Sequence, residues 1–165
     1  MDEQRIRMDT PEAEHWVDAD TYAAVAVDVV LAAHLNHSFA LCFYDAVEEA
    51  GALIHLKLAT PGRVQDAALT DTTLSMDLAL IDRSMRELKI LCPRAQHWQA
   101  KLAAQIEDNP TARERFEDLL GFVTACLREY EVELTISHTH ETKPFDVRFR
   151  PTMGEVAQGA RRLAP

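Results

Sequence analysis

Apolar residues alternate with polar or small ones over several short stretches, which is the pattern of half-buried β-strands. These stretches begin at Tyr22, Phe39, Gly51, His97, Val132 and Phe145. In the first, Val25, Val27 and Val29 predict a single strand. The second, 39–43, is almost wholly apolar, which indicates that both of its faces are covered. The acidic link at 45–50 is short enough to join the second and third stretches as an antiparallel hairpin.

Two longer stretches carry apolar residues at steps of three and four, as amphipathic helices do. The first stripe runs through 74–88, with Asp71 as the expected N-cap and Pro93 just beyond its end. The second runs through 116–130 and follows a capping-box pattern that starts at Thr111. The order of strands, helix, strand, helix and strands predicts an α+β layered fold.

We expect a polar N-terminal arm over residues 1–20, in which Trp16 and Val17 can dock, followed by a single domain over 21–165. The two parts differ because the arm has little hydrophobic periodicity. No repeat or linker interrupts the rest of the chain.

Composition and charge narrow the class of protein. Among the 165 residues, 17 are basic and 27 acidic, a formal net charge of −10. This balance argues against binding to nucleic acid or to an anionic membrane surface. No apolar stretch is long enough to span a bilayer, since Asp28 interrupts the longest candidate, and the charged start predicts no signal peptide. The three cysteines lack metal-ligand spacing, so we expect a cytoplasmic protein with reduced thiols.

The chemistry centres on a polar turn that leads into the second stretch. Ser38 lies just before the second stretch. His55 lies inside the following strand, on the side away from the more apolar face. A hydroxyl and an imidazole can act as nucleophile and general base on an amide. Cys42, within an apolar strand, is interpreted as a buried structural thiol.

Three features follow one another along the chain: the turn, the apolar strand that ends in Tyr44–Asp45 and the Gly-plus-His strand after the hairpin. This order gives the sequence a resemblance to the chemoreceptor glutamine deamidase (CheD) family. The resemblance continues in order over roughly residues 20–158, through segments at 71–74, 99–102 and 145–149. It implies a layered α/β sandwich with mixed β-sheets and two long helices, related to cysteine hydrolases and deamidating toxins. It also implies conversion of receptor glutamines to glutamate.

The turn departs from the family pattern. In the family it reads Leu-Gly-Ser-Cys, and its cysteine attacks the amide. Here Leu35 matches, and the three positions after it are occupied by Asn36, His37 and Ser38. His55 stands at the position of the base, and the threonine that orients the catalytic pair is replaced by Ala32, which has no polar side-chain atom. Family glycines near 102–104 and 138–140 are also replaced.

These replacements predict a family member whose deamidase activity is lost or reduced and whose protein-binding role is kept. The resemblance implies chemoreceptor helices or a chemotaxis phosphatase as partners. We expect no cofactor. The residues assigned to the pocket or to partner binding are Asn36, His37, His138 and His140.

Two alternatives remain open from the residues. One is an active amidohydrolase in which Ser38 and His55 still work together. The other is a metal-binding module built from His37, His55, His138 and His140, with Glu141 as a further ligand.

Overall fold

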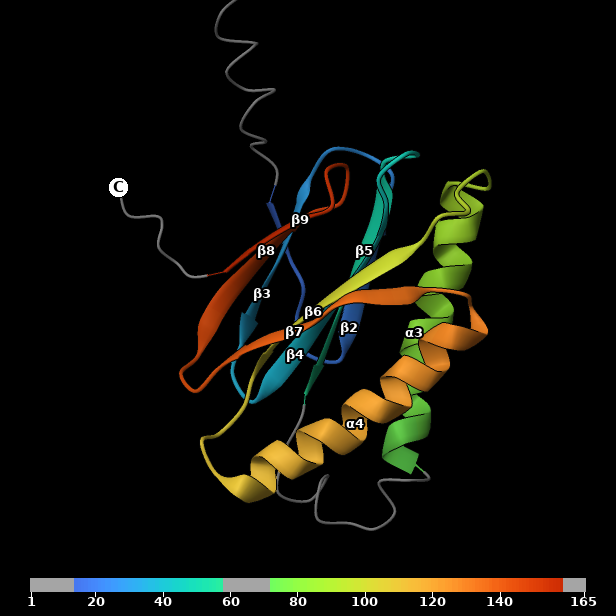
Figure 1. The fold of residues 1–165 in the computed structure, drawn as a ribbon. Helices are drawn as coiled ribbons and strands as arrows, with labels where there is room; N and C mark the ends of the chain where they lie inside the picture. The colour runs from blue at the N-terminus through green and yellow to red at the C-terminus, as the bar shows by residue number, and fades with distance from the viewer. Residues whose placement is uncertain (1–13, 58–71, 159–165) are drawn as a thin grey trace, which may run out of the picture.

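The computed structural model describes residues 14–57 and 72–158, which form two β-sheets and two helices (Figure 1). The elements are β1 (Glu14–Trp16), β2 (Thr21–Val25), β3 (Val30–Leu35), β4 (Ser38–Asp45), β5 (Ala50–Lys57), α3 (Thr72–Leu91), β6 (Gln99–Gln105), α4 (Pro110–Glu129), β7 (Glu133–Glu141), β8 (Phe145–Arg150) and β9 (Glu155–Gln158). The four-stranded sheet has the order β1-β3-β8-β9 and the five-stranded sheet the order β2-β5-β4-β6-β7. Both are mixed, because β1 pairs with β3, and β6 with β7, in parallel.

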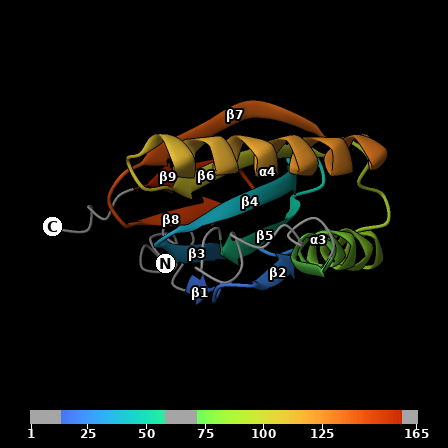
Figure 2. The same cartoon turned by 90° about the horizontal axis from the view of Figure 1, so that it is seen from below.

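The five-stranded sheet is the middle layer (Figure 2). Alternate residues of β4 face opposite ways, as the pattern predicted. Phe39, Leu41 and Phe43 pack in the same apolar cluster as the buried residues of the two helices. Ala40 and Cys42 pack in a second cluster, against the four-stranded sheet. All eight residues of β4 are buried, which confirms that both of its faces are covered.

The described parts of both amphipathic stripes face the middle layer. Ile81, Met85 and Leu88 of α3, and Phe116, Val123 and Leu127 of α4, are buried there. The expected α+β fold with two long helices and mixed sheets is therefore confirmed at this level. Neither helix in the described ranges is long and apolar enough to cross a membrane. The expected N-cap Asp71 lies outside the described residues.

The expected single strand around Val25, Val27 and Val29 is wrong. The chain leaves the five-stranded sheet after Val25 and enters the four-stranded sheet at Val30. Val27 lies between them, with 64% of its surface exposed. Alternation is a local pattern, and it does not report that neighbouring valines belong to different sheets.

Two boundaries also differ from the prediction. Asn109, rather than Thr111, caps α4, and its side-chain oxygen accepts a hydrogen bond from the N–H of Ala112 at 2.8 Å. Pro110 explains the shift, because proline fits the first helical position and has no N–H to satisfy. Within the expected polar arm, Glu14–Trp16 form β1, and Val17 docks with only 3% of its surface exposed.

A buried carboxylate joins two connections at one end of the middle layer. Asp45 ends β4, and one of its oxygens accepts hydrogen bonds from the N–H groups of Val47 and Glu48. The other accepts from Gln96 and His97, which precede β6. The β4–β5 hairpin, predicted from the short acidic link, is confirmed and is fixed by this residue.

Candidate functional site

Ser38 and His55 come together because β4 and β5 are antiparallel neighbours. Ala40 is the register partner of His55, and Ser38 is that of Lys57. The chain reaches Ser38 through a tight turn in which His37 adopts a positive φ of 54°. Side chains alternate along each strand, so Ser38 and His55 project on the side of the middle layer that faces the four-stranded sheet.

Four groups form one hydrogen-bonded relay. Nε2 of His55 lies 2.8 Å from Oγ of Ser38, and Nδ1 lies 2.8 Å from the carbonyl oxygen of Val17. A carbonyl oxygen only accepts hydrogen bonds, so Nδ1 carries the proton in the neutral ring. Nε2 is then free to accept from the Ser38 hydroxyl, whose oxygen accepts from the N–H of Asn36 at 3.1 Å. This tautomer is the one that a general base requires.

The environment favours a neutral imidazole. Only 1% of Ser38 and 4% of His55 is exposed. Burial lowers the pKa of His55, since it disfavours the charged ring. The hydrogen bond to Val17 and the nearby carboxylates of Asp18 and Asp20 act in the opposite direction, and they do not outweigh burial.

The sequence offered no polar side chain to orient His55, because Ala32 stands where the resemblance places a threonine. Ala32 is fully buried in β3. Its carbonyl accepts a hydrogen bond from the N–H of Val17 at 2.7 Å. The orienting group is thus the backbone carbonyl of Val17, on the segment beside Ala32. A backbone carbonyl has no signature in the sequence, so only the docking of Val17 was foreseeable.

A pocket of about 260 Å³ opens beside the pair. The polar residues that line it are Asp18, His34, Asn36, Ser38, His55 and Lys57. Nδ1 of His34 lies 2.8 Å from a carboxylate oxygen of Asp146. Sequence reasoning missed His34 and Lys57. His34 does carry a signal, because it is the one polar residue in the strand Val30–Leu35.

The other assigned residues lie apart from this pocket or outside the description. The ring of His37 faces the carboxylate of Glu107 at 3.8 Å, and His37 is not among the residues that line the pocket. His138 and His140 belong to β7, beside β6, and the structure does not describe their side chains. The expected gathering of histidines therefore stays a prediction. Among the described side chains, no group of three or more potential metal ligands occurs.

Gln105 supports the turn, and sequence reasoning missed it. Its side chain is almost fully buried at the end of β6. Its amide oxygen accepts a hydrogen bond from the N–H of His37, and its nitrogen donates to the carbonyl of Thr142 at 2.9 Å. It therefore ties the turn that carries Ser38 to the loop before β8. The signal is a single amide within an otherwise apolar run at 102–106.

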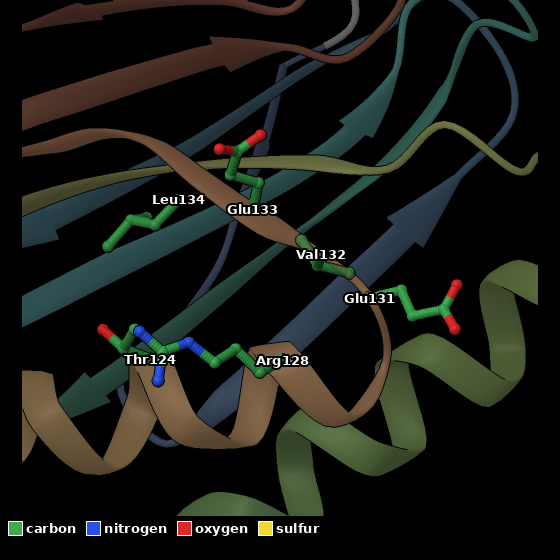
Figure 3. Close-up of a pocket in the computed structure, with 6 residues that line it drawn as sticks. All are labelled: Thr124, Arg128, Glu131, Val132, Glu133 and Leu134. Carbon is green, nitrogen blue, oxygen red and sulfur yellow. The ribbon is translucent and has the colours of Figure 1, made fainter.

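A second pocket lies where α4 meets β7 and has a volume of about 350 Å³ (Figure 3). Thr124 and Arg128 line it from α4, and Glu131 and Glu133 line it from the connection and from β7. The charged side chains point in different directions (Figure 3). This pocket contains no paired nucleophile and base, so the relay at Ser38 is the stronger candidate for a site.

The fold and site define a layered α/β protein with a buried serine–histidine pair. Comparison of the chain with protein-family models and with curated proteins gives no match. Functional inference therefore rests on the geometry of the pair.

Proposed function

We propose that the protein is an amidohydrolase in which Ser38 is the nucleophile and His55 the general base. The observation that carries the proposal is the double hydrogen bonding of His55, to Ser38 and to Val17, both at 2.8 Å. It supplies the oriented base that a weakly acidic serine hydroxyl needs. The absence of a polar side chain at position 32 therefore does not argue against catalysis.

In the proposed reaction, His55 takes the hydroxyl proton while Ser38 Oγ bonds to the amide carbon. The C–N bond then breaks as the proton moves from His55 to the leaving nitrogen, so that ammonia departs and the acyl group remains as an ester on Ser38. Water, deprotonated by Nε2 of His55, attacks the ester carbon. The ester C–O bond breaks to give a carboxylate, and the proton passes from His55 back to Ser38 Oγ. Asn36 and Lys57 line the pocket and are the proposed donors to the tetrahedral oxyanion.

The proposed substrate class is a primary amide on a side chain. A pocket of about 260 Å³ is smaller than most sites for whole ligands and suits a single side chain. The resemblance to the chemoreceptor glutamine deamidase family points to glutamine presented on a receptor helix. This substrate assignment is an analogy with the family, added to the chemistry of the site.

The test is ammonia release from chemoreceptor fragments and from glutamine peptides, with mass spectrometry to locate each new glutamate. We expect release by the natural protein and its loss in Ser38→Ala and in His55→Gln. Ser84→Ala is the matched control, since Ser84 is also fully buried and its hydroxyl donates to a carbonyl of its own helix, that of Ile81. Release that persists in Ser38→Ala would overturn the proposal.

A second candidate function is binding without cleavage, and the burial of Ser38 favours it. With 1% of its surface exposed and its oxygen engaged by Asn36, the hydroxyl is poorly placed to meet a substrate. In this case the protein is a cytoplasmic partner of chemoreceptor helices or of a chemotaxis phosphatase, with its former site kept as a structural link. Binding of a receptor fragment by both the natural protein and Ser38→Ala, with no ammonia from either, would support this function.

A further inference from the structure

β1 is a short and weakly paired strand. It has three residues and, among the strands that the structure describes, lies at the edge of its sheet and pairs with β3 alone, in parallel. Such a strand forms few backbone hydrogen bonds, and parallel pairing is slightly less stable per residue. The next residue along the chain is Val17, whose carbonyl orients His55. The N–H of Val17 donates to the carbonyl of Ala32, and side-chain contacts add to this bond in keeping the segment in place.

Arg148 of β8 supplies such contacts from across β3. Its Nε donates to a carboxylate oxygen of Glu14 at 2.7 Å, and its guanidinium lies 5.2 Å from the centre of the Trp16 ring. Trp16 and Arg148 are both register partners of Ala32, on opposite sides of β3. The small side chain of Ala32 leaves room for the arginine and the indole to meet above it.

We propose that Arg148 is a positioning residue for the Ser38–His55 pair, which it serves by holding β1 and hence the Val17 carbonyl against Nδ1 of His55. The inference rests on the proposed function. The side chain of Ala32 lies on the face of β3 that it shares with Trp16 and Arg148, and its small size permits the contact between them.

The segment is also held from the other side, by β5. The N–H of Asp20 donates to the carbonyl of His55 at 2.6 Å, so the turn after Val17 is bound to β5. Val17 lies between that turn and β1. Release of β1 would leave the turn attached and the Val17 N–H bond to Ala32 as the remaining link to β3, so the Val17 carbonyl would be less firmly held against the ring.

The test is the tautomer of His55, read from its ring ¹⁵N shifts and assigned by comparison with His55→Gln. The natural protein should show Nδ1–H. Arg148→Met should populate Nε2–H and lower kcat by about tenfold with little change in KM. Arg148→Lys, which keeps the charge beside Glu14, should restore part of both. The matched control is Arg150→Met, on the same strand, where the arginine binds Asp28 at 2.9 Å.

An unchanged tautomer in Arg148→Met overturns the inference, and so does an equal change in Arg150→Met. If Arg148→Met does not fold, Glu14→Gln removes the same ion pair from the other end, and an unchanged tautomer there overturns it too. The tautomer is read without substrate. An inactive natural protein would therefore defeat the proposed function while the shifts still decide the role of Arg148.

Discussion

The carbonyl oxygen of Val17 accepts a hydrogen bond from Nδ1 of His55 at 2.8 Å, although 38 positions separate the two residues in the chain. This bond fixes the proton on the ring nitrogen that faces away from Ser38. Serine hydrolases commonly assign that task to a carboxylate. A neutral carbonyl orients the ring but stabilises the imidazolium less, so we expect a slower catalyst than a full triad.

The proposed hydrolysis should depend on pH through the buried histidine. Burial lowers the pKa of His55, while Asp18 and Asp20 oppose this and His34 adds to it. Because His55 must be neutral to accept the serine proton, activity should persist below the ordinary histidine pKa of about 6.5 and fall at more acidic pH. The measurement is kcat/KM across the acid range. A loss of kcat/KM that already begins at or above the ordinary histidine pKa of about 6.5 would contradict this expectation.

The same shift affects folding stability in a defined direction. The unfolded chain takes up a proton at His55 more readily than the folded protein does. Stability should therefore fall as the pH drops below about 6.5. Urea unfolding of the natural protein and of His55→Gln at several pH values measures this contribution. The variant should lack that part of the pH dependence, and identical profiles would count against a lowered pKa.

Replacement Ser38→Cys should create a reactive thiol. Cysteine is more acidic than serine, and His55 is already oriented to remove its proton. We expect faster hydrolysis and selective alkylation by iodoacetamide at position 38, mapped by mass spectrometry. Cys42 is an internal control, because burial raises the pKa of its thiol far above the usual range. A folded variant whose new thiol resists alkylation would favour the binding function instead.

Adding Ala32→Thr to that variant should bring no further gain in rate. The orienting bond already comes from Val17, and residue 32 is fully buried beneath Trp16 and Arg148. Extra atoms in such a position typically cost about 1–3 kcal/mol of stability. Urea unfolding should show that loss for Ala32→Thr alone. A clear increase in kcat on adding the threonine would mean that the Val17 carbonyl orients His55 only in part.

Asp45→Asn should destabilise the fold without touching the site. The carboxylate accepts four backbone hydrogen bonds, and an amide nitrogen in place of one oxygen leaves two donors unpaired. We expect a loss of about 3 kcal/mol in the free energy of unfolding. Asp118→Asn is the control, since Asp118 is exposed on α4 and should change stability by less than about 0.5 kcal/mol.

Acid titration offers an independent check on Asp45. Burial alone would raise the pKa of this carboxyl, but hydrogen bonds from His97, Glu48, Gln96 and Val47 lower it below the ordinary value. Its contribution is therefore present above the ordinary aspartate pKa of about 3.9 and is lost as pH falls through the lower folded value. Asp45→Asn should flatten the stability profile in that window.

Gln105→Leu should loosen the turn before Ser38. The substitution removes the acceptor for the His37 N–H and the donor to Thr142. We expect faster hydrogen exchange at the His37 amide and a loss of about 2 kcal/mol in stability. Gln99→Leu is the matched control, because Gln99 bonds Tyr44 at the opposite end of β6. Equal rates of hydrogen exchange at the His37 amide in the two variants would show that Gln105 does not hold the turn.

Local patterns predicted the elements that local forces define. The alternation in 39–43 and the stripes in the helices identify faces that must be buried, and the short link at 45–50 determines a hairpin. Together they also indicated that Ser38 and His55 lie on adjacent strands. The crossing between sheets after Val25 was missed, because the same valines suit either sheet.

The supports of the site are less visible in the sequence because they depend on long-range contacts. Val17 acts through its backbone, which any residue could supply in principle. Gln105 and Arg148 are ordinary polar residues until the strands that flank Ser38 and β1 are placed. Their importance depends on which neighbours the topology gives them, and one sequence alone does not contain that information.

The relay from Asn36 to Val17 spans the boundary between the two sheets at one end of the sandwich. Small residues, among them Ala33, Ala40 and Ala103, fill the adjoining core and let the sheets approach closely. Both Ser38 and His55 are buried and doubly bonded, so neither side chain can turn without losing a partner. Ser38 and His55 both lie in the five-stranded sheet, whereas Val17 directly follows β1 of the other sheet. A shift of one sheet against the other would therefore break the bond between Val17 and His55 and leave the bond between Ser38 and His55 in place.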